Sequence, residues 1–106
     1  MPHLTTHVLD AASGTPAAGI EIALTTASGS AIADGVTDDD GRAGLGPDAL
    51  VPGDYTLRFE TREHFAARGV EAFYPFVTVT FTVTDDRHYH VPILLSPFAY
   101  STYRGS

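Results

Sequence analysis

Two histidines near the end of the chain, His88 and His90, are separated by a single residue in the segment RHYHVPILLSPFAYSTYRGS. Residues two apart on a β-strand project from the same face, so both imidazoles should point the same way. An imidazole can move a proton near neutral pH or bind a metal. The spacing therefore fits a catalytic pair, a metal clamp, or simply the polar outer face of a half-buried sheet. Adding His7, from another predicted strand, would make a three-histidine zinc site if all three side chains converged.

The last four residues, Tyr103, Arg104, Gly105 and Ser106, follow a predicted strand with no linker between. Terminal residues are usually poorly ordered. Residues that follow a strand this closely should instead be held in place, which makes them a candidate site. Arginine can bind a carboxylate or stabilise a developing oxyanion. No G-x-S-x-G turn accompanies any serine, so the sequence does not support a Ser-His-Asp triad.

The composition excludes several kinds of chemistry. The chain has no Cys, Lys, Asn, Gln or Trp, which removes thiol nucleophiles, disulfides and Schiff bases. Its net charge of -7 argues against nucleic acid or an anionic membrane as a partner. No apolar run is long enough for a membrane helix, and no signal peptide is visible. We therefore expect a cytoplasmic protein.

Period-two patterns predict the elements that must position these residues. The clearest is at 77–84, where Val77, Val79, Phe81 and Val83 alternate with threonines. At 4–10 the pattern places His7 opposite Val8, and at 88–95 it places His90 opposite Val91. Further strands are predicted at 20–26, near 31–33, from 42 onward, at 55–60 and at 98–103.

Two other segments carry weaker signals. The Asp-rich stretch at 36–46 lacks the acidic residues that a calcium loop needs at Val36 and Pro47, and we interpret it as a hairpin turn. TREHFAA at 61–67 predicts one short helix, capped by Thr61 and too short to be more than a surface decoration. His64 in this helix and His3 near the N-terminus are expected to be solvated.

With 106 residues, the chain is the size of one domain, spanning 1–106. Seven to eight short strands with turns about every ten residues predict an all-β, antiparallel Greek-key β-sandwich with one short helix. From the residues alone, function reaches no further than a His/Arg/Tyr site near the C-terminus.

Four motifs are similar to those of 5-hydroxyisourate hydrolase, the enzyme branch of the transthyretin family. They are THVLD at 6–10, DGR at 40–42, HYHVP at 88–92 and LLSPFAYSTYRGS at 94–106. The resemblance covers nearly the whole chain. YRGS is its most specific part, because hormone-carrying transthyretins lack it.

The resemblance implies a transthyretin-like (prealbumin-like) sandwich assembled as a homotetramer, a dimer of dimers with active sites where the dimers meet. It implies hydrolysis of 5-hydroxyisourate to 2-oxo-4-hydroxy-4-carboxy-5-ureidoimidazoline, a step of urate catabolism towards allantoin, without metal or cofactor. The catalytic residues it implies are His7, Arg42, His90 and Ser106. The substrate-binding residues it implies are His7, Arg42, Tyr103, Arg104, Gly105 and Ser106.

Two alternatives of other classes stay open at this point. One is a transthyretin-like carrier of small molecules without turnover. The other is a zinc hydrolase using His7, His88 and His90. Under the hydrolase reading, His7 and His90 are the expected proton-handling pair, and the sequence does not say which is the base.

Overall fold

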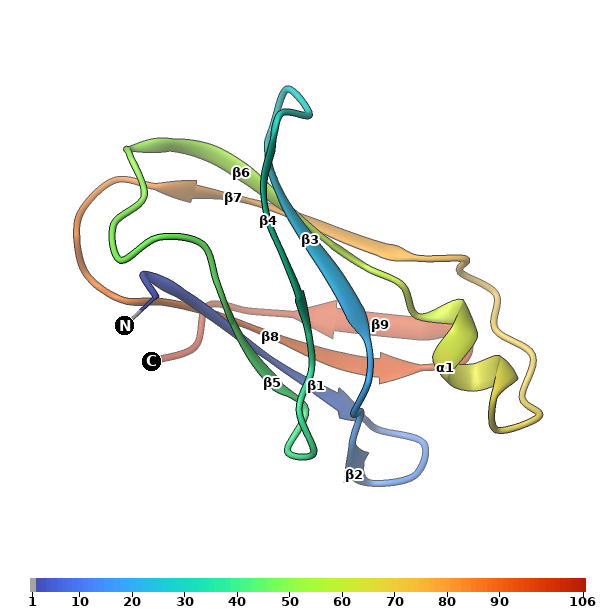
Figure 1. Ribbon diagram of the computed structural model, residues 1–106. Coiled ribbons are helices and arrows are strands. Elements are labelled where there is room, and N and C mark those ends of the chain that lie inside the picture. Colours follow the sequence, from blue (N-terminus) through green and yellow to red (C-terminus); the bar gives the residue numbers. More distant parts are fainter. Residues whose placement is uncertain (1) are drawn as a thin grey trace.

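The computed structural model describes residues 2–106, which fold into two facing β-sheets with one short helix at one end (Figure 1). The prediction of a β-sandwich is therefore confirmed. In chain order the elements are β1 (Leu4–Asp10), β2 (Thr15–Pro16), β3 (Glu21–Thr26), β4 (Ala31–Val36), β5 (Arg42–Leu45), β6 (Gly53–Phe59), α1 (Arg62–Ala66), β7 (Val77–Val83), β8 (Tyr89–Ser96) and β9 (Ala99–Thr102).

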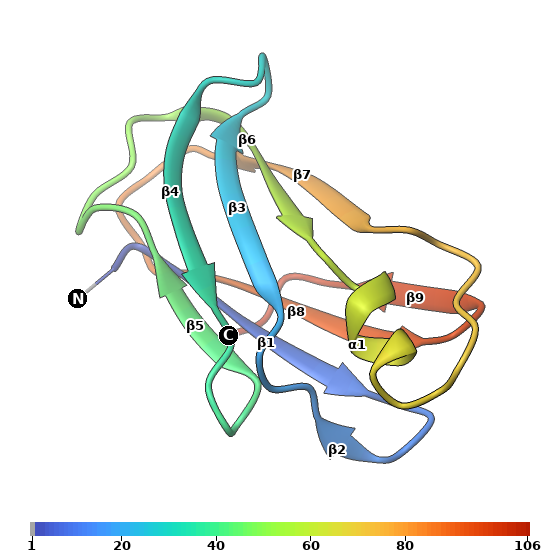
Figure 2. The same cartoon turned by 45° about the vertical axis from the view of Figure 1, so that its right-hand side comes forward.

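Each sheet combines strands from distant parts of the chain. The first sheet runs β2-β1-β8-β9, and β5 pairs with β1 beside β2. The second runs β4-β3-β6-β7. Figure 2 shows the two layers from a second direction, with β1, β5, β8 and β9 in one and β3, β4, β6 and β7 in the other. Strand β2, a two-residue pairing with Leu9 and Asp10, lies in a stretch that the sequence presents as a connection.

One strand pair departs from the antiparallel expectation. β1 and β8 run parallel, in register from Leu4 beside Tyr89 to Asp10 beside Leu95. Hairpin turns force antiparallel pairing only between strands that are close in sequence. The whole second sheet is inserted between β1 and β8, so that constraint does not apply. The pair joins the two segments that carry the histidines.

The core lies between the sheets, where period-two alternation places the apolar side chains. In β1, Leu4, Thr6 and Val8 are buried, whereas Thr5 and His7 on the other face are only partly covered. The same alternation in β8 buries Tyr89, Val91, Ile93 and Leu95. The predicted inward faces of both strands are confirmed, so the histidines at 7, 88 and 90 belong to the outward face of the first sheet.

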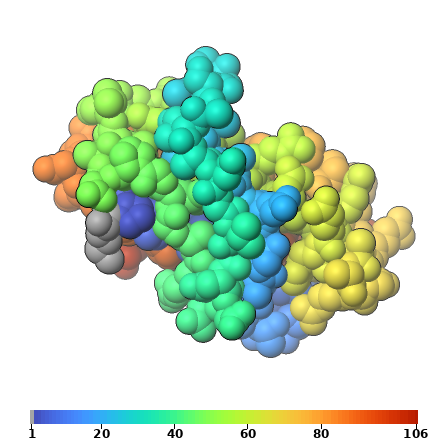
Figure 3. Space-filling view, in the orientation of Figure 1, coloured from blue at the N-terminus to red at the C-terminus, as the bar shows by residue number. Residues whose placement is uncertain are grey.

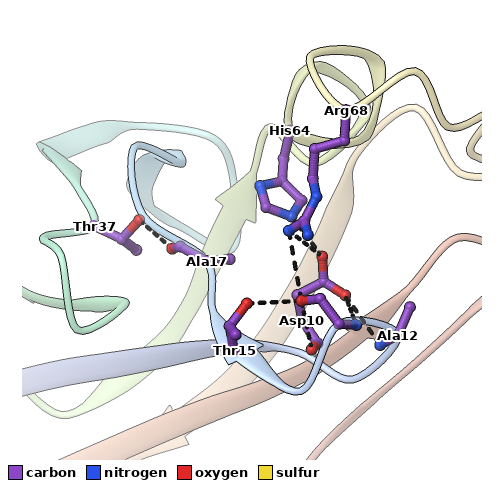
Figure 4. Close-up of polar contacts among 8 residues, drawn as sticks. Asp10, Ala12, Thr15, Ala17, Thr37, His64 and Arg68 are labelled. Carbon is purple, nitrogen blue, oxygen red and sulfur yellow. Dashed lines mark hydrogen bonds and ion pairs between the residues drawn. The ribbon is translucent and has the colours of Figure 1, made fainter.

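Helix α1 does more than decorate the surface, so that expectation was wrong. Phe65 packs in the core at 2% exposure. The side chain of the buried Asp10 accepts hydrogen bonds from His64 Nε2 at 2.8 Å and Arg68 Nη1 at 3.2 Å (Figure 4). Thr61 stands at the start of the helix, but its side chain forms no capping hydrogen bond. The helix is held by tertiary contacts that span more than fifty positions of sequence.

His3 is also buried, at 4% exposure, so its expected solvation was wrong too. Its Nδ1 accepts a hydrogen bond from the Leu50 backbone amide at 2.8 Å. Its Nε2 lies 2.8 Å from the carbonyl oxygen of Arg87, to which it must donate. Both ring nitrogens are thus used to join the N-terminus to two loops.

The outer shape follows from this layering. In the space-filling view, β4 and the turn after it lie at the front of the molecule, and the stretch around α1, in yellow, forms its right-hand end (Figure 3). Among residues 2–106, no helix is long and apolar enough to cross a membrane.

Candidate active site

A shallow cleft of about 360 Å³ lies on the outward face of the first sheet. It is open to solvent, and its volume falls near the lower end of the range for small-molecule sites. Strands β1 and β5 form its floor, and β8 and the C-terminal residues border it. The lining residues are Thr5, Thr6, Asp38, Arg42, Ala43, Gly44, His88, His90 and Ser106.

Contacts with neighbouring residues hold both the ring and the backbone of His90 in this cleft. Its Nδ1 lies 2.8 Å from Thr5 Oγ1, and the parallel register places Thr5 directly beside it. Burial lowers the pKa of His90. The charges of Arg42, His7 and His88 lower it further, while a hydrogen bond to the backbone of Thr5 raises it. His90 is therefore a neutral base over a wider pH range than a free histidine.

Arg42 owes its position to the Asp-rich turn before β5. Asp38 Oδ1 accepts hydrogen bonds from the backbone amides of Asp40 and Arg42. Gly41 has a φ of 75°, and a Cβ there would lie 2.4 Å from the Val8 carbonyl oxygen. The predicted turn is present, but it is not a hairpin, because the strands it joins, β4 and β5, belong to different sheets. It places the exposed Arg42 of β5 directly beside His7 on the neighbouring strand β1.

Gly105 packs against the His90 ring. The β8–β9 register continues to an isolated bridge between His90 and Gly105, and the Gly105 amide donates to the His90 carbonyl at 2.8 Å. A Cβ at Gly105 would lie 2.5 Å from His90 Cδ2 and 3.4 Å from Pro92 Cδ. Only glycine lets the C-terminal residues lie this close to the imidazole. Ser106, the next residue, is then brought into the cleft.

Tyr103 and Arg104 do not line the cleft in the single chain. Both line a separate cavity of about 260 Å³ together with the core-facing Tyr89 and Val91. The Arg104 guanidinium carbon lies 4.3 Å from the centre of the Tyr89 ring, a cation–π contact. Here Arg104 fixes the C-terminal segment to the core side of β8.

His7 shares the outward face with His90 but borders the cleft rather than lining it. It faces Arg42 on one side and Pro92 on the other. Its charge acts on His90. Of the sequence-predicted catalytic set, the structure thus groups Arg42, His90 and Ser106 in one cleft, with His7 at its border.

A shared metal site at His7, His88 and His90 is not formed. No three His, Asp or Glu side chains within 2–106 are arranged to hold a metal ion. His88 Nε2 and His90 Nδ1 instead both lie 2.8 Å from Thr5 Oγ1.

Sequence reasoning missed Thr5 and Asp38 as parts of this site. Nothing in the local pattern marks Thr5, because its contacts are with residues far away in the sequence. His88 is 83 positions from Thr5 and His90 is 85 positions from it, so both contacts depend on how β1 and β8 pair. A signal for Asp38 was available, since aspartate followed by glycine three positions later is typical of a turn that accepts backbone hydrogen bonds.

Comparisons with known proteins match the chain along almost all of its length. Residues 4–105 match the model of the HIUase/Transthyretin family. The chain is 45% identical over 111 residues to a 5-hydroxyisourate hydrolase of Mus musculus, with 97% of this chain and 94% of that protein covered. The structure of Klebsiella pneumoniae 5-hydroxyisourate hydrolase superposes with a TM-score of 0.89 at 39% identity, covering 97% and 98% of the two chains. Sea bream transthyretin in complex with thyroxine superposes with a TM-score of 0.87 at 33% identity, covering 96% and 93%.

Proposed function

Since the chain belongs to the HIUase/Transthyretin family, we propose that it is an enzyme of urate degradation that hydrolyses 5-hydroxyisourate in the cleft between β1, β5 and β8. The observation that carries the proposal is the position of His90. A partly buried imidazole with a lowered pKa lies in one cleft with Arg42 and Ser106. That combination supplies a base and an oxyanion-stabilising cation.

The proposed mechanism is general acid–base opening of a ring amide. Water adds to the C6 carbonyl carbon while one histidine of the pair, His7 or His90, takes the water's proton. The C6–N1 bond then breaks, and a histidine returns a proton to N1. Such proton transfer typically contributes ~10²–10⁴-fold to the rate.

The other residues have roles that follow from their positions. Arg42, exposed to the cleft, stabilises the negative charge on the C6 oxygen and binds substrate oxygens. Ser106 orients water or substrate, and Gly105 sets the position of the His90 ring. Arg104 and Tyr103 remain proposed substrate-binding residues, and a second subunit would have to complete that role.

We extend the proposal to assembly as a homotetramer whose dimers meet over the clefts. Strand β8 presents Leu94, a large apolar side chain at 38% exposure, on the same face as His90. A second copy placed over this face would cover Leu94 and turn an open cleft into a closed pocket.

Absorbance decay of 5-hydroxyisourate, generated in place from urate by urate oxidase, tests the function. We expect the wild type to accelerate the decay, and His90→Ala, Arg42→Met and a chain lacking residues 104–106 to lose the acceleration while remaining folded. Arg62→Met is the matched control, because Arg62 is exposed on α1 away from the cleft. Wild-type decay at the spontaneous rate would refute the hydrolase.

A carrier is the second candidate, favoured only by the likeness to sea bream transthyretin. The lining with two imidazoles and a guanidinium suits a polar ring better than a hydrophobic ligand. Tight binding of thyroxine by isothermal calorimetry, together with no hydrolysis, would support the carrier.

A further inference from the structure

Thr5 contacts both imidazoles of the cleft with a single hydroxyl. Its Oγ1 lies 2.8 Å from His88 Nε2 and 2.8 Å from His90 Nδ1. His90 lies on β8 and His88 immediately precedes this strand, and the parallel pairing places Thr5 beside His90. The hydroxyl thus forms a continuous hydrogen-bonded path between the two imidazoles.

The hydroxyl links the protonation of the two rings. It carries one proton and two lone pairs, so it can donate to only one ring nitrogen at a time. If His90 Nδ1 is bare and accepts from Thr5, His88 Nε2 must carry a proton to keep its own bond. If His88 Nε2 is bare, His90 Nδ1 must carry one. The arrangement excludes only the state in which both nitrogens are bare.

The two rings differ in exposure. His88 is exposed, whereas His90 is partly buried beside Gly105. The groups that face His90 are His7 on β1, Arg42 on β5, Asp38 before β5 and His88 before β8, and Ser106 adds no charged side chain. Most of these are cationic or become so on protonation. A positive charge on His90 is therefore opposed by its surroundings, and on His88 it is solvated.

We propose that Thr5 and His88 are positioning residues that form a proton relay to His90, an inference that rests on the proposed hydrolase function. When the substrate water gives its proton to His90 Nε2, the Nδ1–H bond breaks and that proton passes to Thr5 Oγ1. The Thr5 O–H bond breaks in turn, and its proton forms a bond to His88 Nε2. The positive charge then resides on His88 in solvent.

The reverse shifts complete the cycle. His88 Nε2 returns its proton to Thr5 Oγ1, and the Thr5 hydroxyl proton passes to His90 Nδ1. As Nδ1 gains this proton, the Nε2–H bond of His90 breaks and the proton goes to the leaving N1 nitrogen. Both rings regain their starting tautomers, and no other reactant is needed.

Four variants test the relay: Thr5→Val, Thr5→Ser, His88→Gln and the Thr5→Val/His88→Gln double variant. Thr5→Val keeps the branched shape but removes the hydroxyl, and we expect kcat to fall about tenfold or more with little change in KM. Thr5→Ser restores the hydroxyl and should recover most of kcat. The double variant should be no slower than either single variant, because both break the same path. Thr56→Val is the control, since its hydroxyl bonds Thr80 on the other sheet.

The pH profile separates a relay from a packing role. In the wild type, protonation of either imidazole blocks the path, so both set the acid limb of kcat. In Thr5→Val and His88→Gln only His90 sets this limb, which should move to lower pH. Wild-type kcat and an unmoved limb in Thr5→Val, or additive losses in the double variant, would overturn the relay. If Thr5→Val does not fold, an unmoved limb and unchanged kcat in the exposed-site variant His88→Gln would overturn it.

Nitrogen-15 NMR of the imidazoles tests the relay without turnover. The two rings should titrate in a linked manner in the wild type and independently in Thr5→Val. Independent titration in the wild type would overturn the relay even if the enzyme is active. A wild type that fails to accelerate decay but shows linked titration would refute the hydrolase and leave the coupling standing.

Discussion

Gly105 directly determines the position of the proposed catalytic imidazole, because it has no side chain and the His90 ring packs against it. Adding one methyl group at Gly105 would bring it to 2.5 Å from His90 Cδ2. We expect Gly105→Ala to rotate the His90 ring or to displace the C-terminal residues. Activity should fall by one to two orders of magnitude, roughly what a misplaced proton-transfer group costs.

Initial rates and thermal unfolding midpoints would check this expectation. Gly14→Ala is the matched control, because nothing lies within 4 Å of its added Cβ, although its φ of 74° strains any side chain. The control should lose stability and keep its turnover. Full activity in Gly105→Ala would contradict the assigned role.

The electrostatics of His90 give a second expectation for single residues. Burial lowers the pKa of His90, and the charge of Arg42 is the next largest cause. Removing that charge in Arg42→Met should therefore raise the pKa of His90 towards its ordinary value of 6.5. Titration followed through the imidazole proton resonances measures this directly. Arg62→Met should leave the titration unchanged, and a lowered pKa in Arg42→Met would show that another interaction dominates.

Among the elements, α1 and the end of β1 are joined through one buried carboxylate. Burial disfavours the charged form of Asp10, but hydrogen bonds from His64 and from the Ser13 and Ala12 amides outweigh burial and lower its pKa below 3.8. A lowered carboxyl pKa stabilises the fold above the unfolded-state value, and this contribution is lost as the pH falls below 3.8. Figure 4 shows the contacts of His64, Arg68 and Ala12 converging on Asp10.

We expect Asp10→Asn to lower the free energy of unfolding at pH 7 by about 1.5–3 kcal/mol, the usual value of hydrogen bonds to a charged group. The difference from the wild type should shrink as the pH is lowered through 3.8. Urea unfolding at a series of pH values would measure both. Asp54→Asn is a suitable control, because Asp54 is exposed and its side chain accepts a hydrogen bond from the hydroxyl of a threonine, Thr82. A constant difference across pH would mean that the Asp10 charge is not the stabilising feature.

The same elements show how far sequence patterns reach. Alternation along β7 and β8 predicted which faces are buried, because each strand's period is set locally. The same alternation in β1 and β8 also placed His7 and His90 on the outward face. It could not give the parallel register of β1 and β8, which brings Thr5 to His90, nor the contact of His64 with Asp10. The direction of Arg104 was equally hidden, since it depends on where Tyr89 lies in the assembled core.

For the whole molecule, the proposed assembly predicts a link between quaternary structure and turnover. Leu94→Arg places a charge on the outward face of β8 beside the cleft, where a second dimer would lie. We expect the variant to sediment as a smaller species and to lose most of its activity while each subunit stays folded. Analytical ultracentrifugation and circular dichroism would follow the two properties.

Ile32→Arg provides the comparison, because Ile32 is a similarly exposed aliphatic residue on β4 of the other sheet. This control should keep the sedimentation and activity of the wild type. A Leu94→Arg protein with unchanged sedimentation would place the subunit contact elsewhere.

The parallel pairing of β1 with β8 also constrains how the protein is made. A ribosome delivers β1 first, yet its parallel partner β8 emerges much later, since the paired residues Leu4 and Tyr89 are 85 positions apart. Until then the edge of β1 that pairs with β8 has no partner, although the strands of the second sheet have already been made. Contacts this distant in sequence form slowly. A chain interrupted before β8 would carry an open strand edge that can recruit other chains, so stalled synthesis of this protein should yield aggregates or substrates for chaperones and proteases.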